Sequence, residues 1–204
     1  NDTGLNTGGM GTIAPNPYYT ESVAAECIEK IFLPTVSAMN SEGRTFKGCL
    51  YFGLMLTKDG PKVIEYNCRF GDPETQVVLP LLESDLLTVM QATTNGTLDK
   101  CEVKFTNKHA CCVIMASNGY PEAYEKGFEI TIPDDIKNKV YVAGAAIKDS
   151  ALVTAGGRVL GATAIADTLE EAIEKAYVAT KQIKLENGYY RNDIGQRALL
   201  ALKK

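Results

Sequence analysis

Residues 49–74 run CLYFGLMLTKDGPKVIEYNCRFGDPE, and this stretch decides the fold of the first half of the chain. Two apolar runs, Cys49–Thr57 and Lys62–Asn67, flank the turn-forming residues 58–61 (KDGP). An Asp-Gly pair between apolar runs is a strong signal for a β-hairpin. The pattern therefore predicts two antiparallel strands, followed by the polar segment Arg69–Glu74.

The second predicted strand carries a row of polar side chains. Because side chains alternate along a strand, Glu65, Asn67 and Arg69 lie on one face. A carboxylate and an amide oxygen are hard ligands that suit Mg²⁺, and a guanidinium pairs with phosphate or carboxylate. The alternative is a solvated strand face with a Glu–Arg salt bridge. Apolar neighbours around the row favour a partly buried, functional face.

A glycine-rich stretch opens the chain, with residues 2–11 running DTGLNTGGMG. Glycines allow a backbone to approach a ligand closely, and their N–H groups bind an anion without help from lysines. The alternative is a plain flexible loop, and glycine content alone does not decide between the two.

The rest of the chain predicts an α+β fold in two parts. The first part, residues 1–98, also has an amphipathic helix over 20–40, kinked near Pro34, and helices over 77–82 and 85–94. The second part, residues 99–204, is a small α/β domain of mixed sheet and helix. Its predicted strands are 110–116, 139–146, 152–154 and 159–166, and its helix covers 169–185.

Composition restricts the function classes. A net charge of −4 and a pI of about 5.2 argue against a nucleic-acid partner. No apolar run is long enough to span a membrane. The six cysteines form no Cys-x-x-Cys pair and His109 is the only histidine, which disfavours a zinc site and favours reduced thiols in the cytoplasm. The chain starts at Asn1 rather than Met, so we expect a fragment.

Several motifs together resemble the glycinamide ribonucleotide synthetase (phosphoribosylamine-glycine ligase) family. They include residues 6–11 (NTGGMG), 53–63 (GLMLTKDGPKV) and 67–76 (NCRFGDPETQ). The resemblance continues through residues 117–121 (SNGYP), 156–160 (GGRVL) and 190–195 (YRNDIG), so it covers essentially the whole chain.

This resemblance implies the C-terminal part of an ATP-grasp domain, an antiparallel sheet with helices, followed by the family's C-terminal domain. The implied reaction belongs to purine biosynthesis. Glycine attacks the γ-phosphate of ATP, and 5-phosphoribosylamine then captures the acyl phosphate to give glycinamide ribonucleotide, ADP and phosphate. Glu65 and Asn67 match the family's ligands for Mg²⁺ or Mn²⁺. Arg69 matches its anion-handling arginine and is the candidate catalytic residue.

The same comparison gives a set of candidate substrate-binding residues: Asp2, Asn6, Thr7, Gly8, Gly9, Met10, Arg69, Gly71, Asp72 and Arg158. Among them, Asp2 is a candidate partner for the glycine ammonium, and Arg158 for the substrate phosphate. Arg191, Asp193 and Arg197 are further candidates for contact with the substrate phosphate or a domain interface. The alternative is that Arg191 and Asp193 form a structural ion pair that holds the C-terminal tail.

The N-terminal half that the family uses to hold ATP and phosphoribosylamine is not in these 204 residues, so we expect this chain alone to be inactive. Two alternatives stay open. One is another ATP-grasp carboxylate-amine ligase. The other is a non-catalytic docking module within a multifunctional purine-synthesis polypeptide.

Overall fold

The computed structural model describes residues 3–203, which fold into two compact units. The first unit contains the segment up to Pro15, Asp72–Leu81 and the chain from Asn107 onward. The second contains Asn16–Gly71 and Leu82–Thr106. The chain therefore passes between the units several times. A single division into residues 1–98 and 99–204 stays a prediction.

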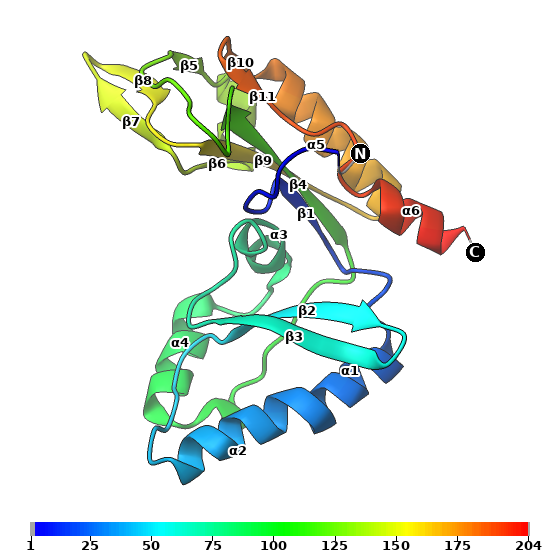
Figure 1. The fold of residues 1–204 in the computed structure, drawn as a ribbon. Coiled ribbons are helices and arrows are strands. Elements are labelled where there is room, and N and C mark those ends of the chain that lie inside the picture. Colours follow the sequence, from blue (N-terminus) through cyan, green and yellow to red (C-terminus); the bar gives the residue numbers. More distant parts are fainter. Residues whose placement is uncertain (1–2, 204) are drawn as a thin grey trace. The chain divides into compact units, whose positions relative to one another are not determined.

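A five-stranded sheet forms the centre of the first unit (Figure 1). Its long strands β4 (His109–Ser117) and β9 (Arg158–Ala166) lie side by side. β6 (Val140–Val142) pairs with the other edge of β9, while β1 (Gly11–Ala14) and β11 (Gly188–Tyr189) pair with the other edge of β4. All these pairs are antiparallel, and together with the helices they form the expected α+β fold.

Helix α5 (Leu169–Gln182) covers one face of this sheet (Figure 1). It starts where the sequence predicts, because the Thr168 side chain accepts a hydrogen bond from the Glu171 N–H at 3.2 Å. It ends at Gln182, three residues before the predicted end. Ile183 has an extended backbone, and the next two residues form a strand.

The opposite face of the sheet packs against α3 (Thr75–Val78) and the 3₁₀ turn η2 (Leu79–Leu81). Cys111 belongs to the hydrophobic cluster under α5, while Cys112 belongs to the cluster with Val77 and Leu81. This arrangement confirms that adjacent cysteines on β4 point to opposite faces and are buried.

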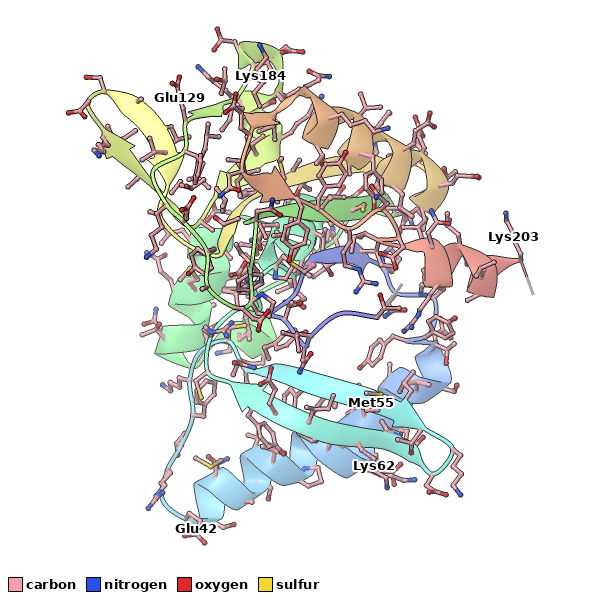
Figure 2. The ribbon with its side chains drawn as sticks, turned by 45° about the horizontal axis from the view of Figure 1, so that its top comes forward. Glu42, Met55, Lys62, Glu129, Lys184 and Lys203 are labelled. Atoms are coloured by element: carbon pink, nitrogen blue, oxygen red, sulfur yellow. The ribbon has the colours of Figure 1, made fainter. Side chains whose placement is uncertain are left out.

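Smaller elements complete the first unit. The predicted strand 139–146 is in fact two strands, because the chain turns at Gly144, where a Cβ would lie 2.4 Å from the Arg158 carbonyl oxygen. Strand β5 (Ile130–Thr131) pairs with β10 (Lys184–Leu185). Figure 2 labels Glu129, the residue before β5, and Lys184, the first residue of β10. The remaining elements are η4 (Asp134–Lys139), β7 (Ala145–Lys148), β8 (Ala151–Thr154) and α6 (Gln196–Leu202).

The second unit is built on a hairpin and a long helix. The hairpin pairs β2 (Tyr51–Thr57) with β3 (Gly60–Asn67), which confirms the sequence prediction. Figure 2 labels Met55 and Lys62, which are partners across it. Gly60 has φ +86°, a conformation that favours glycine at this turn.

The predicted helix over residues 20–40 forms in three consecutive segments: α1 (Glu21–Cys27), the π-helical turn η1 (Ile28–Phe32) and α2 (Leu33–Ser41). The wider turn comes directly before Pro34, which has no N–H to donate. Aromatic contact between Phe32 and Phe52, with ring centroids 4.4 Å apart, joins this helix to the hairpin.

The second unit also contains α4 (Leu86–Asn95) and the 3₁₀ turn η3 (Leu98–Lys100). The Asp85 side chain caps α4 by accepting from the Thr88 N–H at 2.7 Å, and Gly96 ends the helix with φ +71°. Both ends agree with the sequence prediction. Among residues 3–203, no helix combines the length and apolar character needed to cross a membrane.

Candidate functional site

The polar row on β3 lies in the second unit. Glu65 pairs across the hairpin with Gly53, next to a β-bulge between Gly53 and Leu54. A Cβ on Gly53 would lie 2.8 Å from the Glu65 Cγ, so the missing side chain makes room for the glutamate. Within residues 3–203, the exposed Glu65 carboxylate makes no hydrogen bond or ion pair. It is therefore available to a cation.

Asn67 and Arg69 interact directly. The Arg69 Nη2 donates to the Asn67 Oδ1 at 3.0 Å, and its Nη1 donates to the Phe70 carbonyl oxygen at 2.8 Å. The guanidinium thus orients the amide so that its oxygen has a fixed direction. The salt bridge between Glu65 and Arg69 that the alternative interpretation requires is not present among the described residues.

The donor set of this row fits Mg²⁺ or Mn²⁺. Such ions are commonly held by one or two protein oxygens, with phosphate oxygens and water completing the shell. Glu65 and Asn67 offer one carboxylate and one amide oxygen from the same strand face. In the part of the chain that the structure describes, no group of three or more His, Cys, Asp and Glu side chains forms an all-protein metal site.

The glycine-rich loop lies in the first unit, where two of its glycines are closely packed. A Cβ on Gly9 would lie 2.4 Å from the Pro73 Cδ, and a Cβ on Gly8 would lie 3.1 Å from the Tyr120 hydroxyl. Met10 is buried among the apolar side chains around α3, and its carbonyl accepts from the Ile114 N–H at 3.1 Å. This part of the loop is held by the protein rather than free.

Asp72 and Arg158 meet beside this loop. The Arg158 Nη2 lies 2.9 Å from the Asp72 Oδ2, and the Arg158 Nη1 donates to the carbonyl oxygens of Asp72 at 2.8 Å and Gly9 at 3.1 Å. The other carboxylate oxygen of Asp72 accepts from Gln76 at 2.8 Å. Arg158 thus uses three of its five N–H groups within the protein, and each carboxylate oxygen of Asp72 accepts one hydrogen bond. Their direct contact with substrate stays a prediction.

Tyr120 is not among the site residues that the sequence predicts. Its hydroxyl accepts the Gly8 N–H at 3.0 Å, and its carbonyl accepts from the Tyr189 hydroxyl at 2.8 Å. The contact with Gly8 joins residues 112 positions apart in the sequence. Only the motif at residues 117–121 pointed toward this region.

The remaining candidate residues differ in how far the structure describes them. Asp2 lies outside the described residues. Asn6 is exposed, Thr7 is half-buried and Gly71 is buried. The structure brings together Gly8, Gly9, Asp72 and Arg158 in the first unit, and Glu65, Asn67 and Arg69 in the second.

Arg191 and Asp193 form the ion pair that their structural interpretation expects. Nε of Arg191 donates to Oδ1 of Asp193 at 2.8 Å, and Nη2 lies 2.6 Å from Oδ2. The arginine holds the pKa of the Asp193 carboxyl well below its usual range. The Tyr177 hydroxyl fastens the same segment by donating to the Arg191 carbonyl and accepting from the Ile194 N–H.

Comparison with known families accounts for both parts of the chain. Residues 1–75 match the family model described as "Phosphoribosylglycinamide synthetase, ATP-grasp (A) domain". Residues 110–197 match the model described as "Phosphoribosylglycinamide synthetase, C domain". The two matches follow each other along one chain. The chain belongs to the phosphoribosylglycinamide synthetase family.

Individual members of this family are similar over nearly the whole chain. The phosphoribosylamine–glycine ligase of Caldanaerobacter subterraneus is 52% identical over 95% of the chain, which covers 46% of that protein. A bifunctional purine biosynthetic protein of Pichia angusta is 49% identical over 97% of the chain, covering 26% of that protein.

A solved family structure supports the fold. The phosphoribosylamine–glycine ligase of Thermotoga maritima is 40% identical and superposes with a TM-score of 0.84 over 95% of this chain and 48% of its own. The chain thus spans about half the length of the single-function phosphoribosylglycinamide synthetases that it resembles.

Proposed function

We propose that this chain supplies the metal and substrate side of an ATP-dependent ligase that joins glycine to 5-phosphoribosylamine. The products are glycinamide ribonucleotide, ADP and phosphate, with glycyl phosphate as the intermediate of this step in purine biosynthesis. The observation that carries the proposal is the arrangement of Glu65, Asn67 and Arg69. Within residues 3–203 the Glu65 carboxylate makes no hydrogen bond or ion pair, and Arg69 donates a hydrogen bond to Asn67, two residues after Glu65 on β3.

Within this proposal, Glu65 and Asn67 hold Mg²⁺ or Mn²⁺. When bound, the cation neutralises charge on the phosphate oxygens as the phosphoryl group moves. Arg69 is the proposed catalytic residue. Its guanidinium is already oriented by the Asn67 amide, and it stabilises the negative charge of the transferring group without having to reorganise.

The glycine-rich loop is the proposed binding region for glycine and the acyl phosphate. Asn6, Thr7 and the backbone of Gly8, Gly9 and Met10 line it, and Asp2 pairs with the glycine ammonium. Gly71 and Asp72 form the turn that leads from the metal strand to α3. Because phosphoryl transfer depends mostly on positioning and electrostatics, no protein nucleophile is needed.

Relatives about twice as long as this chain suggest that the rest of the site comes from further sequence. In this proposal, an N-terminal half holds ATP and helps to bind phosphoribosylamine, so the 204-residue chain alone does not turn over. We also propose a cytoplasmic location, as suits an enzyme with six free cysteines.

The test is ADP release that depends on both glycine and phosphoribosylamine. It compares this chain with a polypeptide of full family length that carries the same sequence. We expect turnover by the longer protein and none by the chain alone. Turnover by the chain alone would contradict the half-site proposal, and ADP release without glycine dependence would contradict the proposed reaction.

A docking role is the second candidate, suggested by the bifunctional relative of Pichia angusta, in which the matching part is 26% of the protein. A docking module does not require the Glu65 carboxylate. Full turnover by Glu65→Ala in the longer protein would favour this candidate over the ligase.

A further inference from the structure

The guanidinium of Arg158 is a brace between two segments of the first unit. It joins the carbonyl oxygen of Gly9 to both the carbonyl oxygen and the carboxylate of Asp72, at distances of 2.8 to 3.1 Å. Its side chain is only 24% exposed. Three of its five N–H groups are therefore committed to holding the loop against the Asp72 turn.

Tyr120 holds the same loop from a second direction. Its ring fits against Gly157, where a Cβ would lie 2.2 Å from the ring's Cδ2. The Tyr189 hydroxyl fixes its carbonyl at 2.8 Å. With the ring and backbone held, the Tyr120 hydroxyl has a defined position from which it accepts the Gly8 N–H.

These contacts leave the loop little freedom at Gly8 and Gly9. A Cβ on Gly8 would lie 3.2 Å from the Arg158 Cζ and 3.1 Å from the Tyr120 hydroxyl oxygen, so the guanidinium and the phenol form a surface that the glycine backbone follows. The Gly8 N–H and the Gly9 carbonyl are both used in this contact. The Gly8 N–H is therefore not free to bind an anion.

We infer that Arg158 and Tyr120 are positioning residues, which fix the conformation of Gly8–Gly9 and thereby place the neighbouring loop groups for glycine. The importance of the loop for catalysis rests on the proposed function. The contacts of Arg158 and Tyr120 with Gly8 and Gly9, which we call the clamp, do not depend on it. Loop position matters because misplacement of reacting groups by about 1 Å costs on the order of 100-fold in rate.

The first experiment measures the clamp without any reaction. Amide hydrogen exchange at Gly8 is followed by NMR in this chain for the wild type and for Tyr120→Phe. Losing one hydrogen bond is expected to raise the Gly8 exchange rate by about 5-fold. The matched control is Tyr124→Phe. The Tyr124 ring lies 6.3 Å from that of Tyr120, and its hydroxyl makes no hydrogen bond within residues 3–203.

The control variant should leave Gly8 exchange unchanged. If Tyr120→Phe also leaves it unchanged, the clamp is refuted whatever the protein catalyses.

The second experiment measures what the clamp does in the full-length protein. Tyr120→Phe should lower kcat/KM for glycine by about 5-fold, and Arg158→Gln by roughly 10- to 100-fold, with the KM for ATP and the Tm little changed. Arg158→Lys keeps the charge and should restore part of the loss. Variants that lower Tm but leave kcat/KM for glycine at the wild-type value would overturn the positioning role.

Failure of the proposed function and failure of the clamp give different results in these experiments. A wild-type enzyme without glycine-dependent turnover would refute the proposed function, while the exchange measurement still decides whether Tyr120 holds the loop.

Discussion

At the scale of single residues, the position of Glu65 depends on a residue that it faces. Gly53 has no side chain, and the Glu65 Cγ occupies the space that a Cβ would need, at 2.8 Å. Replacing Gly53 must therefore move the glutamate or bend the hairpin, whose bulge lies at the same place. The metal site that we propose is sensitive to a residue that never touches the metal.

We predict that Gly53→Ala raises the Mg²⁺ concentration for half-maximal turnover of the full-length protein by about 10-fold or more, since residues that orient a ligand have effects of this size. A Mg²⁺ titration of ADP release measures it. Leu56→Ala is the control, because Leu56 is 42% exposed and pairs with Pro61 near the hairpin turn, away from the bulge. An unchanged titration for Gly53→Ala would show that Glu65 does not need this space.

Asp193 offers a residue-scale test of stability. Because its pKa is lowered in the folded state, the ion pair with Arg191 stabilises the protein above the unfolded pKa of about 3.9, and this contribution is lost as the pH falls through the folded pKa. We predict that Asp193→Asn lowers the free energy of unfolding by about 1–2 kcal/mol at pH ~7, less at high salt, because the Arg191 side chain is 34% exposed.

Urea unfolding at several pH values measures this difference. It should shrink below pH ~3.9. Glu171→Gln, which breaks the more exposed pair with Lys175, is the control and should change stability by less than ~0.5 kcal/mol. A difference for Asp193→Asn that is independent of pH would contradict the ion-pair explanation.

At the scale of elements, β4 contributes buried side chains to both faces of the five-stranded sheet. Cys111 and Cys112 are both fully buried, on opposite sides. Burial raises the pKa of Cys111 to about 12 and that of Cys112 to about 11. Thiolates react and thiols do not, so both should be inert while the strand is intact.

We predict that iodoacetamide at pH ~8 modifies the exposed Cys68 in the native protein and reaches Cys111 and Cys112 only after unfolding. Peptide mapping by mass spectrometry after timed labelling measures this order. Labelling of either β4 cysteine at the rate of Cys68 would mean that the strand opens under native conditions.

Local signals were sufficient to predict most elements. The hairpin at Asp59–Gly60, the start of α4 at Asp85 and the start of α5 at Thr168 each depend on residues within one turn, and all three form. β1 was missed because its pairing joins Gly11 to Val113, and no local pattern specifies so distant a partner. The short strands β5, β10 and β11 were missed because two residues carry no periodicity.

The same contrast between local sequence signals and long-range contacts applies to the candidate site. Strand alternation predicts that Glu65 and Asn67 share a face of β3, whereas Arg69 lies in the bend after the strand and reaches Asn67 through a hydrogen bond. The role of these residues stays a prediction. The contact of Arg158 with Gly9 spans 149 residues, and that of Tyr120 with Gly8 spans 112. Such contacts exist only after the chain has folded. This is why the sequence predicts a substrate contact for Arg158 and does not predict the contact of Tyr120 with the loop.

At the scale of the whole molecule, each compact unit is assembled from separate segments of the chain. Asp72–Leu81 belongs with the sheet of the first unit, although β3, which precedes it closely in the sequence, belongs to the second. The short link from Arg69 to Asp72 therefore connects the proposed metal row to the residue that Arg158 braces.

The most direct test of the proposed metal row is a Mg²⁺ titration of glycine-dependent ADP release by the full-length protein, wild type beside Glu65→Gln. Glutamine keeps the size of the side chain and removes the charge that we assign to the metal. We predict a loss of turnover of roughly 100-fold or more, relieved in part at high Mg²⁺, with Tm unchanged. Turnover by Glu65→Gln at the wild-type rate and the same Mg²⁺ requirement would contradict this assignment.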